Sequence, residues 1–155
     1  MFKRVTIIED VTKLTSLANE IWREAYLEIL SSDQIDYMLE QYLSVSAIKS
    51  QLENSTTFYL IYKNDQCVGF FSYNLKDVVF LSKLYVKKNF RLQGHAKRVI
   101  NYLKSYVRPI KLTVNIHNQK AIKSYEKLGF KIIEPMKTAI GNGYYMDDFL
   151  MRYDQ

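Results

Sequence analysis

Apolar residues recur at every third or fourth position through the first third of the chain, from Leu14 to Ile29 most regularly. This spacing places them on one face of a helix, so helices are predicted there. Ser, Thr and Asp residues, whose side-chain oxygens cap helix starts, precede each of them. The predicted helices span residues 11–30, 34–43 and about 46–53, with caps from Asp10 or Thr12, from residues 31–33, and from Ser44 or Ser46.

The rest of the chain alternates short β-like runs with two more helical patterns. The glycine within the run at 67–73, Gly69, predicts a bulge or a close backbone approach, and Gly141-Asn142-Gly143 predicts a hairpin turn. Hairpins followed by a β-α-β crossover indicate an α/β protein with one mixed, mostly antiparallel sheet and helices on both faces. We expect a single domain over residues 1–155. The predicted strands are 2–8, 57–62, 67–73, 78–86, 110–116, 130–133 and 144–152, and the helices are 93–107 and 119–128.

Composition narrows the class of protein. The one cysteine, Cys67, excludes an internal disulfide framework and a cysteine-based zinc site, so no metal is expected. The N-terminal segment lacks the apolar core of a signal peptide, and no run approaches the roughly 20 apolar residues of a membrane span. We therefore expect a soluble cytoplasmic protein that does not act at a membrane.

The chain carries 22 basic and 16 acidic residues, a formal net charge of +6. This excess suits an anionic ligand or a nucleic acid, and by itself it does not distinguish them. The basic residues concentrate between Lys83 and Arg98, beside a phosphate-binding type of loop, and no nucleic-acid motif is present. We therefore expect no nucleic-acid partner.

The stretch from Val78 to Val107 indicates a phosphate site. It consists of a strand-like run, a basic loop, the sequence Arg91-Leu92-Gln93-Gly94-His95-Ala96, and a helical pattern. Helix starts present unpaired N–H groups and a positive dipole end, and a glycine there lets a ligand approach the backbone. Lys88 and Arg91 add positive charge. The spacing is neither that of a Walker loop nor that of a dinucleotide fingerprint.

The segment Arg91-x-x-Gly94-x-Ala96 resembles the acyl-coenzyme A loop of the GNAT family of N-acetyltransferases. A second block, Asn118-x-x-Ala121-x-x-x-Tyr125-x-x-x-Gly129-Phe130, resembles that family's second motif region at the expected distance. The order of elements over nearly the whole chain also resembles this family. The resemblance implies the GNAT fold, acetyl-coenzyme A as co-substrate, and acetyl transfer to a primary amine by direct attack on the thioester.

The resemblance also implies roles for particular residues. Asn118 matches the position that contacts the pantetheine arm, and Tyr125 matches the position whose hydroxyl lies near the coenzyme sulfur. A phenol is a suitable acid for a departing thiolate. His95 and Arg98 are further candidates for contact with the nucleotide phosphates. Backbone N–H groups of the strand and loop would bind pantetheine and diphosphate, with contacts expected from Leu84, Val86, Arg91, Leu92, Gln93, Gly94, His95 and Ala96.

The sequence does not determine which residue takes the proton from the incoming amine. Some family members carry a carboxylate on the strand before the loop, and residues 79–83 here contain none. The alternatives, each of which also suits a solvated surface position, are Glu24, Glu28, His117, Asp147 and Asp148.

Four residues are candidates for the acceptor site. Trp22 and Tyr26 lie four apart on the first helix and would line a groove or pack in the core, and the pair Asp147-Asp148 interrupts an apolar strand and favours a cationic group. The predicted acceptor is a small cationic amine or a polyamine, ahead of a peptide N-terminus; an amino sugar and a drug amine stay open. The alternative function is a non-catalytic coenzyme A sensor or regulatory module. A homodimer is compatible with either.

Overall fold

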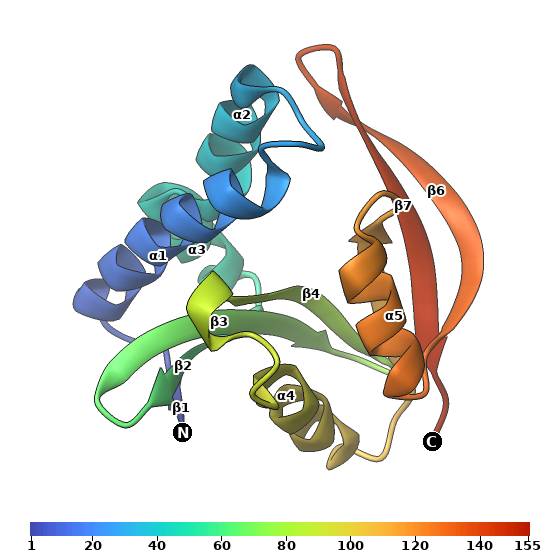
Figure 1. Cartoon of the computed structure of the whole chain (residues 1–155). Coiled ribbons are helices and arrows are strands. Elements are labelled where there is room, and N and C mark those ends of the chain that lie inside the picture. Colours follow the sequence, from blue (N-terminus) through green and yellow to red (C-terminus); the bar gives the residue numbers. More distant parts are fainter. The chain divides into compact units, whose positions relative to one another are not determined.

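The computed structural model describes residues 1–155 and contains five α-helices and seven β-strands (Figure 1). The helices are α1 (Ile8–Tyr26), α2 (Ser32–Leu43), α3 (Val45–Glu53), α4 (His95–Lys104) and α5 (Gln119–Lys127), with a 3-10 turn at Lys88–Phe90. The strands are β1 (Phe2–Arg4), β2 (Thr57–Lys63), β3 (Gln66–Leu75), β4 (Val79–Val86), β5 (Ile110–Asn115), β6 (Lys131–Gly141) and β7 (Tyr144–Tyr153). No helix has both the length and the apolar character needed to cross a membrane.

The strands form one mixed sheet in the order β1-β2-β3-β4-β5-β7-β6. Strands β4 and β5 run parallel, whereas β1 with β2, β2 with β3, β5 with β7 and β6 with β7 run antiparallel. Helix α4 is the crossover that a parallel pair requires. The predicted fold class, a mixed and mostly antiparallel α/β sheet, is confirmed.

The chain forms two compact units. Unit 1 comprises Met1–Asn74 and Lys83–Ala96, and unit 2 comprises Leu75–Ser82 and Lys97–Gln155. Each unit therefore takes one part of β4 and one part of α4. The two units are described separately below, and a single domain over residues 1–155 stays a prediction.

Unit 1 is built on strands β1 to β3, with helices α1 to α3 on one side of them (Figure 1). Helix α1 contacts both α2 and α3. Its side chains Leu14, Ala18 and Ile21 are buried, as the three-to-four-residue spacing predicts. In β3 the six consecutive residues 68–73 are all buried, so both faces of this strand are covered.

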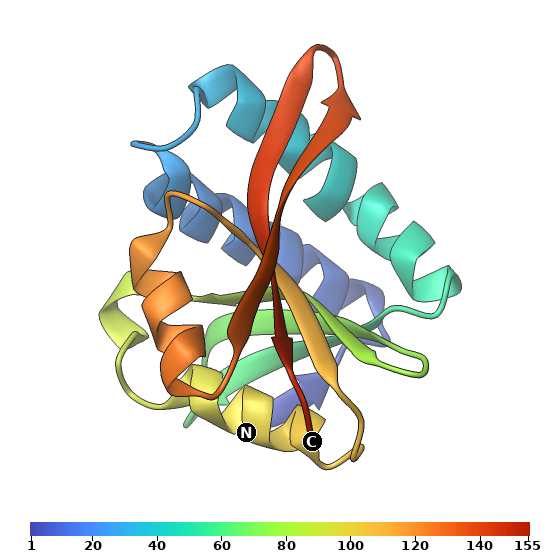
Figure 2. The same ribbon diagram turned by 90° about the vertical axis from the view of Figure 1, so that its right-hand side faces the viewer.

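Unit 2 contains the long β6–β7 hairpin, with α5 beside β7 (Figure 2). The hairpin turns at Asn142-Gly143, where both residues have positive φ (54° and 77°). These angles fit a type I′ turn, which matches the twist of the two strands, so the predicted turn is confirmed. Strand β7 also pairs with β5, and Leu112, Val114 and Met151 are buried there.

The N-terminal prediction was wrong in its bounds. Strand β1 ends at Arg4, and α1 begins at Ile8 instead of Val11. Asp10 does not cap this helix: it lies within the first turn, is buried, and forms an ion pair with Lys3 (Nζ–Oδ1 3.1 Å). A carboxylate in a first turn is stabilised by the helix dipole, so it favours an earlier start.

Side-chain caps fix the starts of the next two helices as predicted. Ser31 Oγ accepts from Gln34 N (3.1 Å) before α2, and Ser44 Oγ accepts from Ala47 N (3.2 Å) before α3. Helix α4 is shorter than predicted, because the residues before it adopt positive φ at Leu92 (63°) and Gly94 (83°) and the helix ends before Val107 (53°).

Candidate active site

The C-terminal half of β4 has backbone groups outside the ladder with β5. The parallel ladder between β4 and β5 pairs only residues 79–81 with 110–112. Lys87 N–H donates to Val68 O of β3 (2.8 Å), and successive residues of a strand alternate between its two edges. The N–H groups of Leu84 and Val86 therefore point away from β3, along an edge that β5 does not pair.

Gly69 allows the backbones of β3 and β4 to lie unusually close. A Cβ at this position would lie 2.4 Å from Tyr85 O, closer than real Cβ contacts occur. The β2–β3 register also shifts beside it, between Ile61 and Tyr62. Both outcomes predicted for this glycine, a bulge and a close approach, are confirmed, and together they fix the path of β4 before the loop.

The loop after β4 has the backbone shape of an anion-binding cradle. Leu92 has a φ of 63° and a fully exposed side chain, Gly94 has a φ of 83°, and α4 starts at His95. Left-handed residues before a helix turn successive N–H groups toward one side, where they add to the helix dipole. A leucine in this conformation, with its side chain in water, is a strained feature of the kind found at functional sites.

Side chains of the loop are tied to unit 1. Arg91 donates from Nε to Val86 O (2.9 Å) and from Nη2 to Glu24 Oε2 of α1 (2.9 Å). Gln93 accepts from Lys63 Nζ (2.6 Å) and donates to Asn89 O (3.3 Å). Arg91, which sequence analysis assigned to the phosphates, thus has two protein partners and positions the loop through them.

The helix start is anchored by a buried ring. His95 is 5% exposed, so its imidazole belongs to the core and a ligand would meet its backbone N–H. Ala96, in the first turn of α4, is partly buried.

The second motif block consists of the start and stop signals of α5. Asn118 Oδ1 caps the helix by accepting from Ala121 N (3.3 Å). At the other end, Phe130 N donates to Tyr125 O (3.0 Å) and Gly129 N donates to Glu126 O (3.0 Å), with a φ of 101° at Gly129. These are the two hydrogen bonds of a Schellman motif, which needs a glycine at this position.

The Schellman motif also holds the ring of Tyr125. Phe130 packs against it edge-on (centroids 5.6 Å apart), and Phe130 in turn contacts Tyr153 (5.7 Å). Contact between these two positions accompanies this type of helix end. Tyr125 is partly buried, in agreement with the prediction that it points inward.

Comparison with protein-family models identifies this combination of segments. The model of the acetyltransferase (GNAT) family matches residues 12–130. The chain belongs to the GNAT acetyltransferase family. The resemblance stated from the two motif blocks is thereby confirmed.

Solved structures of other GNAT proteins have the same fold. The PaiA N-acetyltransferase of Thermoplasma acidophilum, in complex with coenzyme A, is 21% identical over 100% of this chain and 99% of its own (TM-score 0.77). Naa50 of Arabidopsis thaliana, in complex with the bisubstrate analogue CoA-Ac-MVNAL, is 20% identical over 100% and 98% (TM-score 0.66). The ribosomal-protein-alanine N-acetyltransferase of Brucella melitensis is 18% identical over 100% and 99% (TM-score 0.71). No curated protein matches the sequence.

Coenzyme A is thus the group that structural relatives of this GNAT protein hold. Among residues 1–155, no cluster of three His, Cys, Asp or Glu side chains is arranged to bind a metal ion.

The two aromatic acceptor candidates lie in a cluster within unit 1. Trp22 (4% exposed) packs against Tyr26 (8% exposed) and against Tyr85 of β4, with centroids 4.9 and 5.5 Å apart. The hydroxyls of Tyr26 and Tyr85 lie 3.2 Å apart. Burial of this extent is typical of core packing, the alternative stated for Trp22.

Lys83 is an ionisable residue that sequence analysis did not single out. It is largely buried on β4, where Nζ donates to Gln51 Oε1 of α3 (2.7 Å) and lies 5.3 Å from the ring centroid of Phe58. Burial lowers the pKa of this amine to about 8. A lysine within an otherwise apolar strand was the one signal in the sequence.

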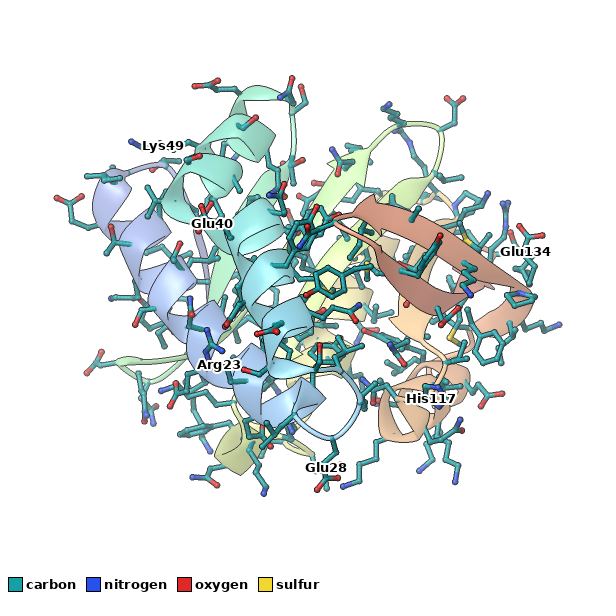
Figure 3. All side chains as sticks on the ribbon, turned by 90° about the horizontal axis from the view of Figure 1, so that it is seen from above. Arg23, Glu28, Glu40, Lys49, His117 and Glu134 are labelled. Carbon is teal, nitrogen blue, oxygen red and sulfur yellow. The ribbon has the colours of Figure 1, made fainter.

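Four of the five candidate bases lie at the surface. Glu24 is bound to Arg91, and Glu28, His117 and Asp147 are exposed. Figure 3 shows Glu28 at the outer edge of unit 1.

Asp148 differs from the other four. It is 7% exposed and lies on β7 at the wall of a cavity of about 210 Å³. Burial, and secondarily the charge of Asp147, raise the pKa of its carboxyl to about 6. Alternation along β7 predicts that the two carboxylates lie on opposite faces of the strand. Asp147 is exposed and Asp148 is buried, and both residues line the same cavity.

Proposed function

We propose that this GNAT protein transfers the acetyl group of acetyl-coenzyme A to a primary amine, by direct attack of the amine on the thioester. One observation carries the proposal: the unpaired edge of β4 leads into a left-handed loop and the start of α4. Such an arrangement offers a row of N–H donors to an extended ligand that ends in a diphosphate.

Two sets of backbone N–H donors would bind different parts of coenzyme A. The N–H groups of Leu84 and Val86 would bind the amides of pantetheine in the manner of an added strand. The diphosphate would accept from the backbone of the cradle, whose six residues are Arg91, Leu92, Gln93, Gly94, His95 and Ala96. In this assignment the side chains of Arg91 and Gln93 hold the loop in shape.

In unit 2, Asn118 and Tyr125 take the roles that their motif positions imply. The carboxamide oxygen of Asn118 caps α5, whereas its Nδ2 group has no partner in the chain and would donate to the pantetheine arm. The hydroxyl of Tyr125 would protonate the departing thiolate. A phenol can donate a hydrogen bond and then a proton to a departing thiolate.

The acceptor is assigned to the class of small cationic amines, including polyamines. The carboxylates Asp147 and Asp148 on β7 support a cation over a neutral amine. A peptide N-terminus is the competing class, since two GNAT proteins of the same fold are named for, or bound to an analogue of, peptide substrates.

Calorimetry with coenzyme A tests the cofactor assignment. Replacing Gly94 with leucine places a side chain in the cradle, and we expect affinity to fall at least 100-fold. Gly143→Leu is the matched control, because Gly143 also has positive φ (77°) and a Cβ there would meet nothing within 4 Å. Equal affinity in the two variants, or no binding by the unaltered protein, contradicts the proposal.

Thiol release with acetyl-coenzyme A and a panel of spermidine, glucosamine and a pentapeptide tests the chemistry. We expect Tyr125→Phe to reduce kcat by about 10²–10⁴, the range for a lost general acid. Tyr153→Phe, which removes a hydroxyl from the same ring cluster, is the control. An unchanged rate for Tyr125→Phe at every pH would remove the residue from the mechanism.

The same panel distinguishes acetyl transfer from the second candidate function, that of a coenzyme A sensor without catalysis. That function is favoured by the absence of a carboxylate on β4, where the half-buried Lys83 lies instead. A sensor would bind coenzyme A in the calorimeter and release no thiol with any amine.

A further inference from the structure

One carboxylate in unit 2 is buried without a protein partner. The buried polar residues of the chain are Asp10, Ser72, His95, Asn115 and Asp148. Asp10 is neutralised by Lys3, whereas the side chain of Asp148 makes no hydrogen bond or ion pair. Asp148 lines a cavity, and a cation bound there would stabilise its partly desolvated carboxylate.

The strand register connects Asp148 to the second motif block. Asp148 on β7 lies opposite Asn115 on β5. The carbonyl oxygen of Asn115 accepts from the N–H of Asn118 (2.9 Å), the residue that starts α5. Residues opposite each other in an antiparallel pair have Cα atoms about 5 Å apart, so Asp148 lies within two residue contacts of Asn118.

The cavity beside Asp148 suits an alkyl ammonium group. Its apolar lining residues are Ile116, Pro135 and Met136, and its charged lining residues are Lys137, Asp147 and Asp148. The strands stay together behind it, because Met136 on β6 lies opposite Asp148 and Ile116 N donates to Asp147 O (3.0 Å). Apolar walls with one buried anion favour a cation that carries a short hydrocarbon arm.

We propose that this cavity receives the ammonium group of the acceptor and that Asp148 removes its proton. The proposal rests on the acetyl transfer proposed above and adds the base that sequence analysis left open. Asp148 is a catalytic residue in this assignment, because its carboxylate touches the reacting nitrogen.

The step balances as follows. An Asp148 oxygen takes one proton from R–NH3⁺, and the lone pair of R–NH2 then forms a C–N bond to the thioester carbonyl carbon. The C–S bond breaks, the sulfur takes the proton of the Tyr125 hydroxyl, and the nitrogen returns a second proton to that oxygen. Asp148 gives its proton to water. The products are the acetamide, the coenzyme A thiol and one proton.

Three charged or titratable residues lie near Asp148. Asp147 on the same strand raises the pKa of Asp148 and His117 follows β5, whereas Lys137 on β6, opposite Asp147, also lines the cavity and its positive charge opposes binding of an ammonium group. A pKa of about 6 leaves Asp148 mostly ionised at neutral pH, yet basic enough to accept a proton when an ammonium enters.

The pH dependence of kcat/KM tests the assignment, with spermidine, glucosamine and a pentapeptide as acceptors. We expect the activity of the unaltered enzyme to rise up to about pH 6, to stay level up to the pKa of the acceptor amine and to fall above it, since the ionised base and the ammonium form together make up the reactive state. In Asp148→Asn the amine must arrive already neutral. Its kcat/KM should be at least 100-fold lower at pH 7 and should rise about tenfold per pH unit toward the pKa of the amine.

Two further variants make the test specific. Glu134→Gln removes the same charge from β6, where the side chain projects outward (Figure 3) and does not line the cavity, so the level region should stay. Asp147→Asn removes the charge that raises the pKa of Asp148, so the acid limb should move to lower pH.

Thermal unfolding supplies a readout that needs no substrate. Asp148→Asn should melt above the unaltered protein at pH 7.5 and together with it at pH 4, because only the ionised carboxylate is disfavoured by burial. A level pH profile in Asp148→Asn, or equal melting differences at both pH values, contradicts the role of Asp148 as the base and leaves the proposed acetyl transfer standing. Failure of the unaltered enzyme to acetylate any of the three amines overturns the proposed function with it.

Discussion

Lys83→Met removes the buried charge of β4 and keeps a side chain of similar length. In the unaltered protein the Lys83 ammonium lies between the amide oxygen of Gln51 and the ring of Phe58. Methionine is flexible and unbranched, so its thioether can occupy the space that the lysine side chain fills. Only the charge and one hydrogen bond are lost, which isolates the effect of burying the charge.

The magnitude follows from the pKa. A fall from 10.5 to about 8 corresponds to about 3 kcal/mol by which burial disfavours the charged form. Loss of the hydrogen bond to Gln51 offsets about 1 kcal/mol of this. We therefore expect Lys83→Met to raise the free energy of unfolding by about 2 kcal/mol at pH 6–7.

The sign reverses the usual lysine behaviour. Because the pKa of Lys83 is lower in the folded state, the unfolded chain binds more protons between pH 8 and 10.5, and the stability of the unaltered protein rises across that window. The advantage of Lys83→Met is therefore full below pH 8 and shrinks as the pH approaches 10.5.

Urea unfolding at pH 6.5, 8 and 9.5 measures this difference. Lys49→Met is the control, since Lys49 projects from the outer side of α3 (Figure 3) and surface replacements change stability by about 0.5 kcal/mol or less. The reasoning is refuted if Lys83→Met is destabilised at pH 6.5, or if its advantage is the same at all three pH values.

Three other replacements have expected outcomes. Gly69→Ala should lower stability by more than about 2 kcal/mol in a urea melt and weaken coenzyme A binding in the calorimeter, because the new Cβ collides with Tyr85 O at 2.4 Å and displaces β4. Asn118→Asp should keep the stability of α5 yet lose affinity for coenzyme A, whereas Asn118→Ala should lose both, with about 1 kcal/mol of stability. Gly129→Ala should destabilise by more than about 1 kcal/mol in the same melts, since its φ is 101° and the ring of Tyr153 lies 3.0 Å from the new Cβ.

The sequence was sufficient to predict the starts and ends of those helices that are set by neighbouring residues. Ser31, Ser44 and Asn118 cap their helices through their own side chains, and Gly129 supplies the left-handed position after α5. These signals act over three or four residues, so they can be recognised without a structure.

Boundaries set by distant contacts could not be predicted in the same way. Asp10 would be a good cap in isolation, but its ion pair with Lys3 and its burial place it inside α1. The helix expected from Gln93 starts at His95, because Leu92 adopts a positive φ that a leucine seldom takes on its own.

In the site, too, features set by neighbouring residues could be predicted, and features set by tertiary contacts could not. The cradle could be found because Gly94 and Ala96 lie within one short segment. The environments of Lys83 and Asp148 could not, since one depends on Gln51 of α3 and the other on the pairing of β7 with β5 and β6. Burial of a charged side chain is decided by such tertiary neighbours.

The energy of the buried carboxylate bears on which acceptor the protein binds. Burial raises the pKa of Asp148 to about 6, so its ionised form lowers the stability of the folded protein at neutral pH. An entering ammonium supplies the missing counter-charge and recovers part of that energy, whereas a neutral or anionic acceptor recovers none. Discrimination in favour of cations would therefore come mainly from a penalty already present in the empty site, and Asp148→Asn should lose that preference while it gains stability.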